Sequence, residues 1–355
     1  MTRGSLAAIL VLALGSCSHR AHRAPETEAD RRVAYYEAKL AGLPRHYPSL
    51  ALLASAELEK AKETGDPAWL ARARLSVAES MAIQPNVEAM KAGAAIASYS
   101  HRFADALELA RRARAAYPPD TGVAALEVEA RLGLGDVDAA EKTLATFPAD
   151  DFHAAFARGL VFAARGKAAD AASSYALAAE RAAAEGVAPL TLFATVSAAG
   201  AYLDSGDPAA ARPFLDRAES LDGNDRRLRI HRVEWLEATG RRDEALAAVE
   251  ALIESRDEAE LRRRAARLSR ERGDAARAET HFAAARALYR IPIEAGEAYT
   301  LEGMALLLAE AGVDLDEAVA LATRNLEWKR DAAAREALEF ARERLAGRRA
   351  GAGGV

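Results

Sequence analysis

The chain of 355 residues is rich in Ala, Arg, Glu and Leu and holds only 6% aromatic residues, a composition that favours helix over β-sheet. A formal net charge of -5 argues against a general nucleic-acid-binding protein, which usually carries a basic excess on one face. The single cysteine excludes a disulfide within the chain and a zinc site built on several thiolates.

The N-terminal segment has the layout of a secretory signal. A short basic start over residues 1–3 precedes an apolar run from Leu6 to Leu14. This run is too short to cross a bilayer as a permanent helix, which takes about 20 residues. Small residues and the sole cysteine follow directly, in the order Leu14, Gly15, Ser16, Cys17.

This order resembles the processing box of bacterial lipoproteins. The resemblance implies that a signal peptide, residues 1–16, is removed and that Cys17 becomes the lipidated N-terminus. An ordinary signal peptide that happens to contain a cysteine is the alternative. Several acyl chains on Cys17 would anchor the protein stably, whereas one chain binds membranes only marginally. Ser18, in place of Asp, favours the outer membrane facing the periplasm by the same resemblance, with the cell surface and the inner membrane as open alternatives.

The next residues predict a tether and then two helices. Residues 17–27 have no apolar period, so we expect a flexible tether. His19 and His22 have no further metal ligand nearby and are expected to be solvated. Apolar spacing predicts a first helix from Glu28 to Ala41 and a second from near Pro48 to Thr64.

From residue 65 onward, turn residues recur at intervals of about 34 residues. These turns are Gly65-Asp66, His101-Arg102, Gly135-Asp136, Gly166-Lys167, Gly206-Asp207, Gly240-Arg241, Gly273-Asp274 and Gly312-Val313. A small residue follows most turns at a fixed distance, at Ala106, Ala140, Ala171, Ala211, Ala245 and Ala278. The interval indicates an array of repeated helix hairpins.

The segment from Phe152 to Ala178 is the clearest of these units. Its small residues would let two helices approach closely, while two aromatic residues fill the space between them. The residues of the pattern are Gly159, Phe162, Ala171, Tyr175 and Ala178. The pattern resembles the tetratricopeptide repeat, in which one hairpin cannot bury its apolar face alone and must stack on others.

The resemblance implies an all-α fold, a right-handed superhelical solenoid of helix hairpins. We expect the array over residues 28–346, with about eight hairpins and a C-terminal capping helix. The capping helix is predicted from Asp331 to Leu345, with Ala334 and Leu338 on its apolar face. Residues 347–355 are expected to be a disordered tail.

No local motif indicates catalysis, because a phosphate-binding glycine loop, a zinc-protease helix and a nucleophile elbow are all missing from the sequence. Asp150, Asp151 and His153 form the densest metal-like cluster. An acidic pair before Phe152 also suits a helix N-terminus, which we favour. We therefore expect no enzyme activity, no cofactor and no metal.

The family register places the first helix of each hairpin on the concave face of the superhelix. It would place an apolar floor there, formed by Ala125, Phe156, Leu160, Phe193, Val196 and Leu203. Such a floor suits an amphipathic helix or an extended apolar peptide. Burial of these side chains as core between stacked helices is an equal alternative.

A basic face is the second candidate binding surface. Arg263, Arg267 and Arg270 share one helical face, which suits a carboxylate or phosphate. Nearby glutamates favour instead a solvated face with weak ion pairs. The family's clamp for acidic C-terminal peptides is not carried over: Lys91 fits it, but Ala95 stands where an Asn is needed.

The sequence thus predicts a membrane-anchored, non-catalytic protein-interaction scaffold of the bacterial cell envelope, in an assembly or adaptor role. Its partners would be other proteins in the concave groove and a membrane at the lipidated end, with no nucleic acid. A receptor for a small or polymeric anionic ligand, such as a cell-wall fragment, is the alternative. An enzyme that carries no local signature ranks last.

Overall fold

The computed structural model describes residues 27–147 and 151–352, which form helices and no strand. This confirms the predicted all-α class. The predicted signal peptide and most of the tether, including Leu14, Gly15, Ser16 and Cys17, lie outside the described residues. Within those residues, no helix is both long and apolar enough to span a bilayer.

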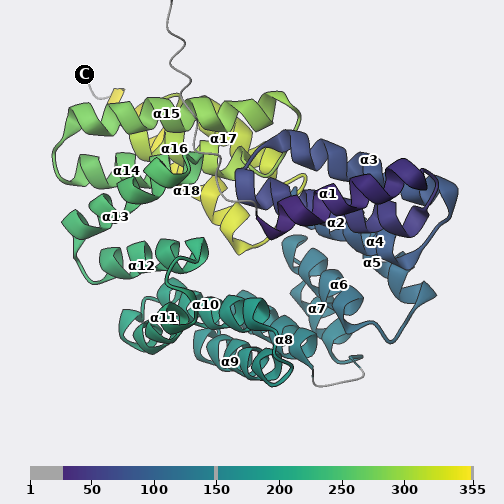
Figure 1. Ribbon diagram of the computed structural model, residues 1–355. Coiled ribbons are helices and arrows are strands. Elements are labelled where there is room, and N and C mark those ends of the chain that lie inside the picture. Colours follow the sequence, from purple (N-terminus) through teal and green to yellow (C-terminus); the bar gives the residue numbers. More distant parts are fainter. Residues whose placement is uncertain (1–26, 148–150, 353–355) are drawn as a thin grey trace, which may run out of the picture.

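The helices follow one another as hairpins between a first and a last single helix (Figure 1). Their bounds are α1 Glu28–Gly42, α2 Tyr47–Thr64, α3 Pro67–Ile83, α4 Val87–Tyr99, α5 Phe103–Ala116, α6 Thr121–Gly133, α7 Val137–Leu144, α8 Phe152–Ala164, α9 Ala168–Ala184, α10 Ala188–Asp204, α11 Pro208–Asp222, α12 Arg226–Ala238, α13 Arg242–Ser255, α14 Ala259–Glu271, α15 Ala275–Glu294, α16 Leu301–Ala311, α17 Leu315–Asn325 and α18 Ala332–Ala352. Pairing from α2 to α17 gives eight hairpins in the described chain.

The turns inside the hairpins lie where the sequence places them. Gly65 ends α2 with a φ of 70°, a left-handed conformation that glycine adopts without steric cost. His101 takes the glycine's place between α4 and α5 with a φ of 58°. Asp66 then begins α3 by accepting a hydrogen bond from the Ala68 N–H, at 2.9 Å.

Small residues lie at the contacts between helices, as expected. The recurring alanines Ala106, Ala140, Ala171, Ala211, Ala245 and Ala278 are all buried. A Cβ atom on Gly159 of α8 would lie 2.4 Å from the Tyr175 ring of α9. The regular pattern therefore encodes close packing within each hairpin.

The first helices of neighbouring hairpins pack on one another, as α2 does on α4, α4 on α6 and α6 on α8. They form the inner layer of the array, and the second helices lie outside. The array coils through about one turn, so the last hairpins return to the first (Figure 1). This return was not predicted from the sequence.

Loops late in the chain meet the first three hairpins along a line that we call the seam. Arg256, between α13 and α14, donates a hydrogen bond to the Lys62 carbonyl oxygen at 2.8 Å. Further on, Glu297 forms an ion pair with Arg74 at 2.5 Å, and the Tyr299 ring lies 6.1 Å from that of Tyr99. The Arg330 N–H donates to the Gly133 carbonyl oxygen at 2.7 Å.

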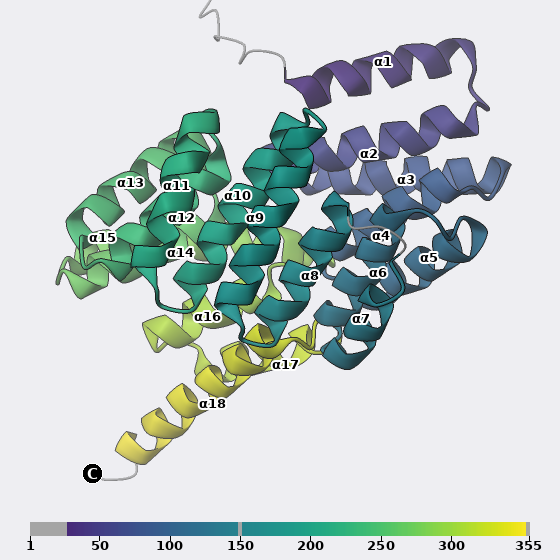
Figure 2. The same cartoon turned by 90° about the horizontal axis from the view of Figure 1, so that it is seen from below.

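Helix α18 confirms the predicted cap, since Ala334, Leu338 and Ala341 are buried. It continues to Ala352 and projects from the body (Figure 2). The predicted disorder is therefore wrong over residues 347–352, where Ala and Arg, both strong helix formers, extend the helix. Arg349 also pairs with Asp316 of α17 at 3.0 Å.

Candidate functional site

The predicted apolar floor contains an aromatic stack between two hairpins. Phe156 of α8 and Phe193 of α10 lie 4.8 Å apart between ring centroids, and both are half-buried. The Phe156 ring also lies 4.9 Å from that of Tyr175, and the Arg227 guanidinium covers Phe193. These two phenylalanines join neighbouring hairpins and expose only part of each ring.

Val196 was predicted to project into the groove, and this is wrong. Its side chain is 2% exposed and packs with Leu215 and Leu228. The reason is the position of α10, which contacts α9, α11 and α12 and so has little free surface. Ala125 is half-buried and also packs into a core cluster.

Leu160 reaches a cavity of about 440 Å³ inside the coil. Helices α6 and α8 form one wall, the turn before α7 and the start of α18 form another, and the end of α10 contributes Asp204. Its lining residues are Phe103, Glu129, Leu132, Gly133, Gly135, Val137, Leu160, Ala163, Ala164, Asp204, Asp331, Ala332, Ala333 and Arg335. The seam thus brings the start of the cap against the third and fourth hairpins, and we call this space the seam cavity.

Two of the carboxylates that line the seam cavity are unpaired among the described residues and have a raised pKa. Glu129 and Asp204 have no hydrogen-bond or ion-pair partner within the described chain. Burial raises the pKa of the Glu129 carboxyl above its usual value, and the charge of Lys62 opposes this only in part. Burial, together with the charge of Glu234, also raises the pKa of Asp204. Glu129 is half-buried, so its negative charge is the more disfavoured, whereas Asp204 at the end of α10 is exposed and its charge is disfavoured less.

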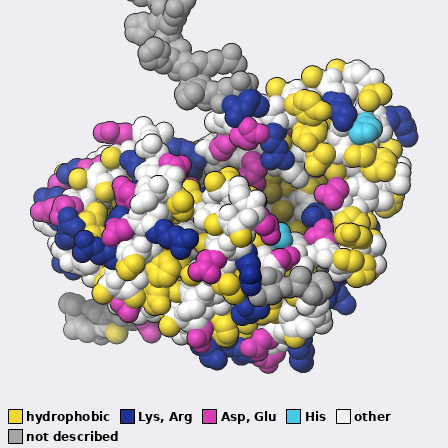
Figure 3. Space-filling model, turned by 60° about the horizontal axis from the view of Figure 1, so that its bottom comes forward, with side chains coloured by type: hydrophobic (Ala, Val, Ile, Leu, Met, Phe, Trp, Pro, Cys, Tyr) yellow, Lys and Arg dark blue, Asp and Glu magenta, His cyan; other side chains and the backbone are white. Residues whose placement is uncertain are grey.

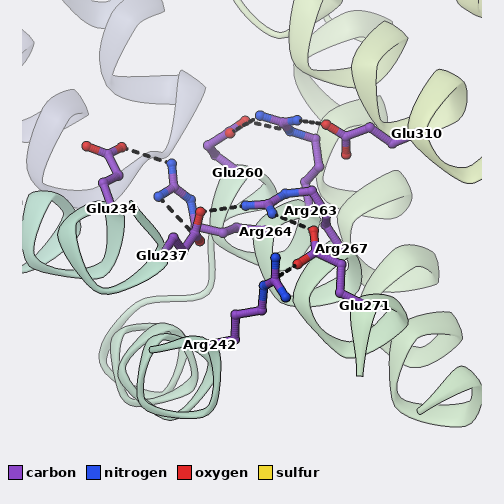
Figure 4. A network of polar contacts seen from close by, with 9 residues as sticks. All are labelled: Glu234, Glu237, Arg242, Glu260, Arg263, Arg264, Arg267, Glu271 and Glu310. Carbon is purple, nitrogen blue, oxygen red and sulfur yellow. Dashed lines mark hydrogen bonds and ion pairs between the residues drawn. The ribbon is translucent and has the colours of Figure 1, made fainter. Parts of the chain in front are cut away.

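The predicted basic face on α14 is matched by glutamates (Figure 4). Arg263 forms ion pairs with Glu260 of its own helix and with Glu310 of α16. Although burial disfavours the charge, these carboxylates raise the pKa of Arg263 above its usual value. Arg270 is exposed and donates to the Glu310 carbonyl oxygen at 3.2 Å.

The same network extends toward α12. Arg267 pairs with Glu237 at 2.6 Å and with Glu271 at 2.9 Å. It lines a second cavity, of about 480 Å³, together with Leu203. An anionic ligand there would have to displace carboxylates that already hold the guanidinium groups. The ion pairs agree with the expected alternative for this face, but the face is not solvated, because the Arg263 and Arg267 side chains are only 17% and 33% exposed.

Comparisons with known proteins agree with this architecture. A family model described as tetratricopeptide repeat matches residues 98–160. A chain of the crystal structure of the APC/C hetero-tetramer Cut9-Hcn1 superimposes with a TM-score of 0.54 at 14% identity, over 88% of this chain and 58% of that one. Residues 98–160 thus match the tetratricopeptide-repeat family, and the described chain has the fold of a tetratricopeptide-repeat solenoid.

Other structural matches are named for the same repeat. A tetratricopeptide-repeat protein from Parabacteroides merdae matches with a TM-score of 0.39 at 15% identity, over 81% of this chain and 98% of that one. The present chain spans 58% of the Cut9-Hcn1 chain that it matches. No curated protein matches the sequence.

Other candidate groups on this solenoid have structural roles. Lys91 pairs with Asp120 at 2.7 Å, which agrees with leaving the carboxylate clamp aside. Asp151 caps α8 by accepting from the Ala154 N–H at 2.9 Å, while Asp150 lies outside the described residues. Over residues 27–147 and 151–352, no group of three or more His, Cys, Asp and Glu side chains is placed to hold a metal ion.

Charge is evenly mixed on the face shown in Figure 3, where acidic and basic side chains lie interspersed. A phosphate backbone would require a continuous basic stripe.

Sequence reasoning did not select Glu129 and Asp204, the two carboxylates lining the seam cavity that are unpaired in the described chain. Glu129 lies one helical turn beyond Ala125, so the groove register was the one signal that pointed toward it.

Proposed function

We propose that this protein is a lipid-anchored, non-catalytic scaffold of the bacterial cell envelope that holds a protein partner on the inner face of its coil. The observation that best supports this proposal is the inner layer formed by the first helices of the hairpins, which the seam holds in a curved shape. A preformed surface loses little conformational entropy when a helix or an extended segment binds. The repeat family, whose members present such surfaces, supports protein binding over catalysis.

The anchor belongs to the proposal through the resemblance of residues 14–17 to the lipoprotein box. A lipid on Cys17 would leave ten residues before Thr27, the first described residue. Extended, that tether reaches roughly 35 Å at 3.3–3.6 Å per residue. The folded array would then work within reach of the membrane surface.

Site-specific crosslinking in the native envelope tests the scaffold. A photoreactive p-benzoylphenylalanine at Leu160 faces the seam cavity, and the same group at Leu221 of α11, which is 46% exposed, serves as an outer control. We expect one protein to crosslink at Leu160 and not at Leu221. Equal products at both positions, or none at Leu160, would contradict binding on the inner face.

Membrane attachment has a separate test. Cys17→Ser should move the protein from the membrane fraction into the soluble fraction, because no acyl chain can then be attached. Density-gradient separation of the two membranes, applied to the unchanged protein, tests the outer-membrane assignment. Continued tight membrane association of the Cys17→Ser protein would contradict the lipid anchor.

A further inference from the structure

We infer that the seam cavity receives the positively charged side chain of an arginine or a lysine from the protein partner. This inference rests on the proposed scaffold function and adds the chemistry of the contact. It starts from Glu129 and Asp204, carboxylates that line the cavity without a partner among the described residues. Glu129, half-buried and without such a partner, gains most from a cation brought to it, and the exposed Asp204 adds a second negative charge to the lining of the same cavity.

Among the described residues, other carboxylates on the inner face form ion pairs with arginines, which Glu129 and Asp204 do not. Glu237 and Glu271 pair with Arg267, and Glu310 pairs with Arg263. Glu129 and Asp204 have no equivalent pairing within the described chain. The one basic residue that lines the seam cavity, Arg335, is exposed on α18 and forms no ion pair within the described chain.

Asp331 does not count as a further free carboxylate. It accepts from the Ala334 N–H at 3.0 Å at the start of α18, and it lies 3.4 Å from the Lys329 ammonium. Because Asp331 already has these partners, Glu129 and Asp204 are the pair of lining carboxylates that remain without one in the described chain. A ligand with a single positive charge fits this pair better than a metal ion, which needs more oxygen ligands.

The remaining walls fit the rest of a basic side chain. Leu132, Val137 and Leu160 supply apolar surface beside Glu129. Arginine and lysine carry a charged group on an aliphatic stem, and the stem packs on apolar surface while the head reaches a carboxylate. A cavity of about 440 Å³ admits such a side chain. The partner segment would lie on the inner layer and direct a basic residue toward α6.

The test compares two peptides that differ only in charge. The probes are acetyl-Leu-Arg-Leu-amide and its citrulline counterpart, a neutral group of nearly the same shape, titrated into the full chain and followed by NMR. We expect the arginine peptide to bind about tenfold more tightly, as one charge-assisted contact provides. Its preference should weaken as the pH is lowered, because a protonated Glu129 carboxyl cannot form an ion pair with the guanidinium.

Glu129→Gln keeps the side-chain shape and should remove most of that preference. The matched control is Glu339→Gln, an exposed glutamate of α18, which should bind as the unchanged protein does. Because Glu129→Gln removes an unpaired charge, its melting temperature should be equal or higher, so lost binding would not reflect unfolding. Equal affinity of the two peptides, or a preference that survives Glu129→Gln, would overturn the inference.

Titration with spermidine distinguishes a free amine from a basic side chain of a protein partner as the source of the positive charge. If spermidine binds with a dependence on Glu129 and the arginine peptide does not bind, the site takes free amines and the partner contact is wrong. The scaffold has its own outcome in the crosslinks at Leu160. Crosslinks that Glu129→Gln leaves unchanged retain the scaffold without this contact, and peptide binding without crosslinks retains the contact without the scaffold.

Discussion

The ring of Tyr175 occupies the position that a side chain on Gly159 would need, since a Cβ atom there would lie 2.4 Å from the ring. The same relationship recurs between Phe103 and Gly133, again at 2.4 Å. Glycine in these first helices is therefore required by the aromatic residue on a second helix. Helix propensity alone would favour alanine at both positions.

Gly159→Ala should therefore destabilise the protein, although alanine is the better helix former. The Tyr175 ring must move, and we expect a loss of about 1–3 kcal/mol in the free energy of unfolding, measured by urea denaturation. Gly347→Ala on α18 is the control, because no heavy atom lies within 4 Å of the position that its Cβ atom would take. That change should be neutral or stabilise by up to about 1 kcal/mol. Equal effects would contradict the packing argument.

The seam is tested by two glycines with nearly the same backbone. Gly135 has a φ of 77° and a Cβ atom there would lie 2.5 Å from the Arg330 carbonyl oxygen, whereas Gly166 has a φ of 70° and open space. Alanine at either position incurs the left-handed cost of about 1–2 kcal/mol. Only Gly135→Ala should also speed hydrogen exchange of the Arg330 amide, which donates to Gly133.

Unchanged exchange at Arg330 in the Gly135→Ala protein would show that the seam tolerates the added methyl group. The comparison with Gly166→Ala removes the part of the effect that comes from the backbone conformation. Any extra loss of stability at Gly135 then measures the clash at the seam.

His101 should make the stability fall in mild acid. Burial, with the nearby charge of Lys329, lowers its pKa from 6.5 to about 4. The folded state then binds fewer protons than the unfolded state between these values, so the stability is full above pH 6.5 and falls by up to about 3 kcal/mol as the pH drops to 4. His101→Asn, which also tolerates a positive φ, should remove this part of the pH dependence. The check is denaturation of both proteins at pH 7 and pH 4.5. An equal loss of unfolding free energy in the unchanged protein and in His101→Asn would contradict the role of His101.

Loss of Arg263 should lower the free energy of unfolding more than loss of an exposed arginine that forms a similar ion pair. Arg263→Met strands the carboxylate of Glu310, whose side chain is 19% exposed, and we expect a loss of about 2 kcal/mol in unfolding free energy. Arg349→Met breaks an exposed pair with Asp316 and should cost less than about 1 kcal/mol. Adding Glu310→Gln to Arg263→Met should recover part of the loss. No recovery would argue against the stranded carboxylate.

Sequence reasoning predicted the hairpins because each turn carries its own local signal. Even the turn at His101 was predicted, since its distance from Gly65 and Gly135 marked a turn without a glycine. The end of α18 differs from the prediction, which placed a disordered tail from residue 347, since α18 continues to Ala352. In the structure, alanines and arginines around Gly347 sustain the helix.

The candidate site was predictable only in part. The register identified Leu160 as an inner residue, yet it also selected Val196, which the crowding of α10 buries. The seam cavity could not be predicted, because it joins Glu129 to Asp331, residues that no periodic pattern relates. Contacts of that kind depend on the summed curvature of many hairpins, and small errors in each accumulate along the chain.

The seam also changes how unfolding should spread. An open array of repeats behaves as a line of nearest neighbours, so its end units can fray while the middle stays folded. Here Arg74 in the first hairpin is held by Glu297, which follows the seventh. Loss of either region removes support from the other, so the two ends should melt together, as one cooperative unit.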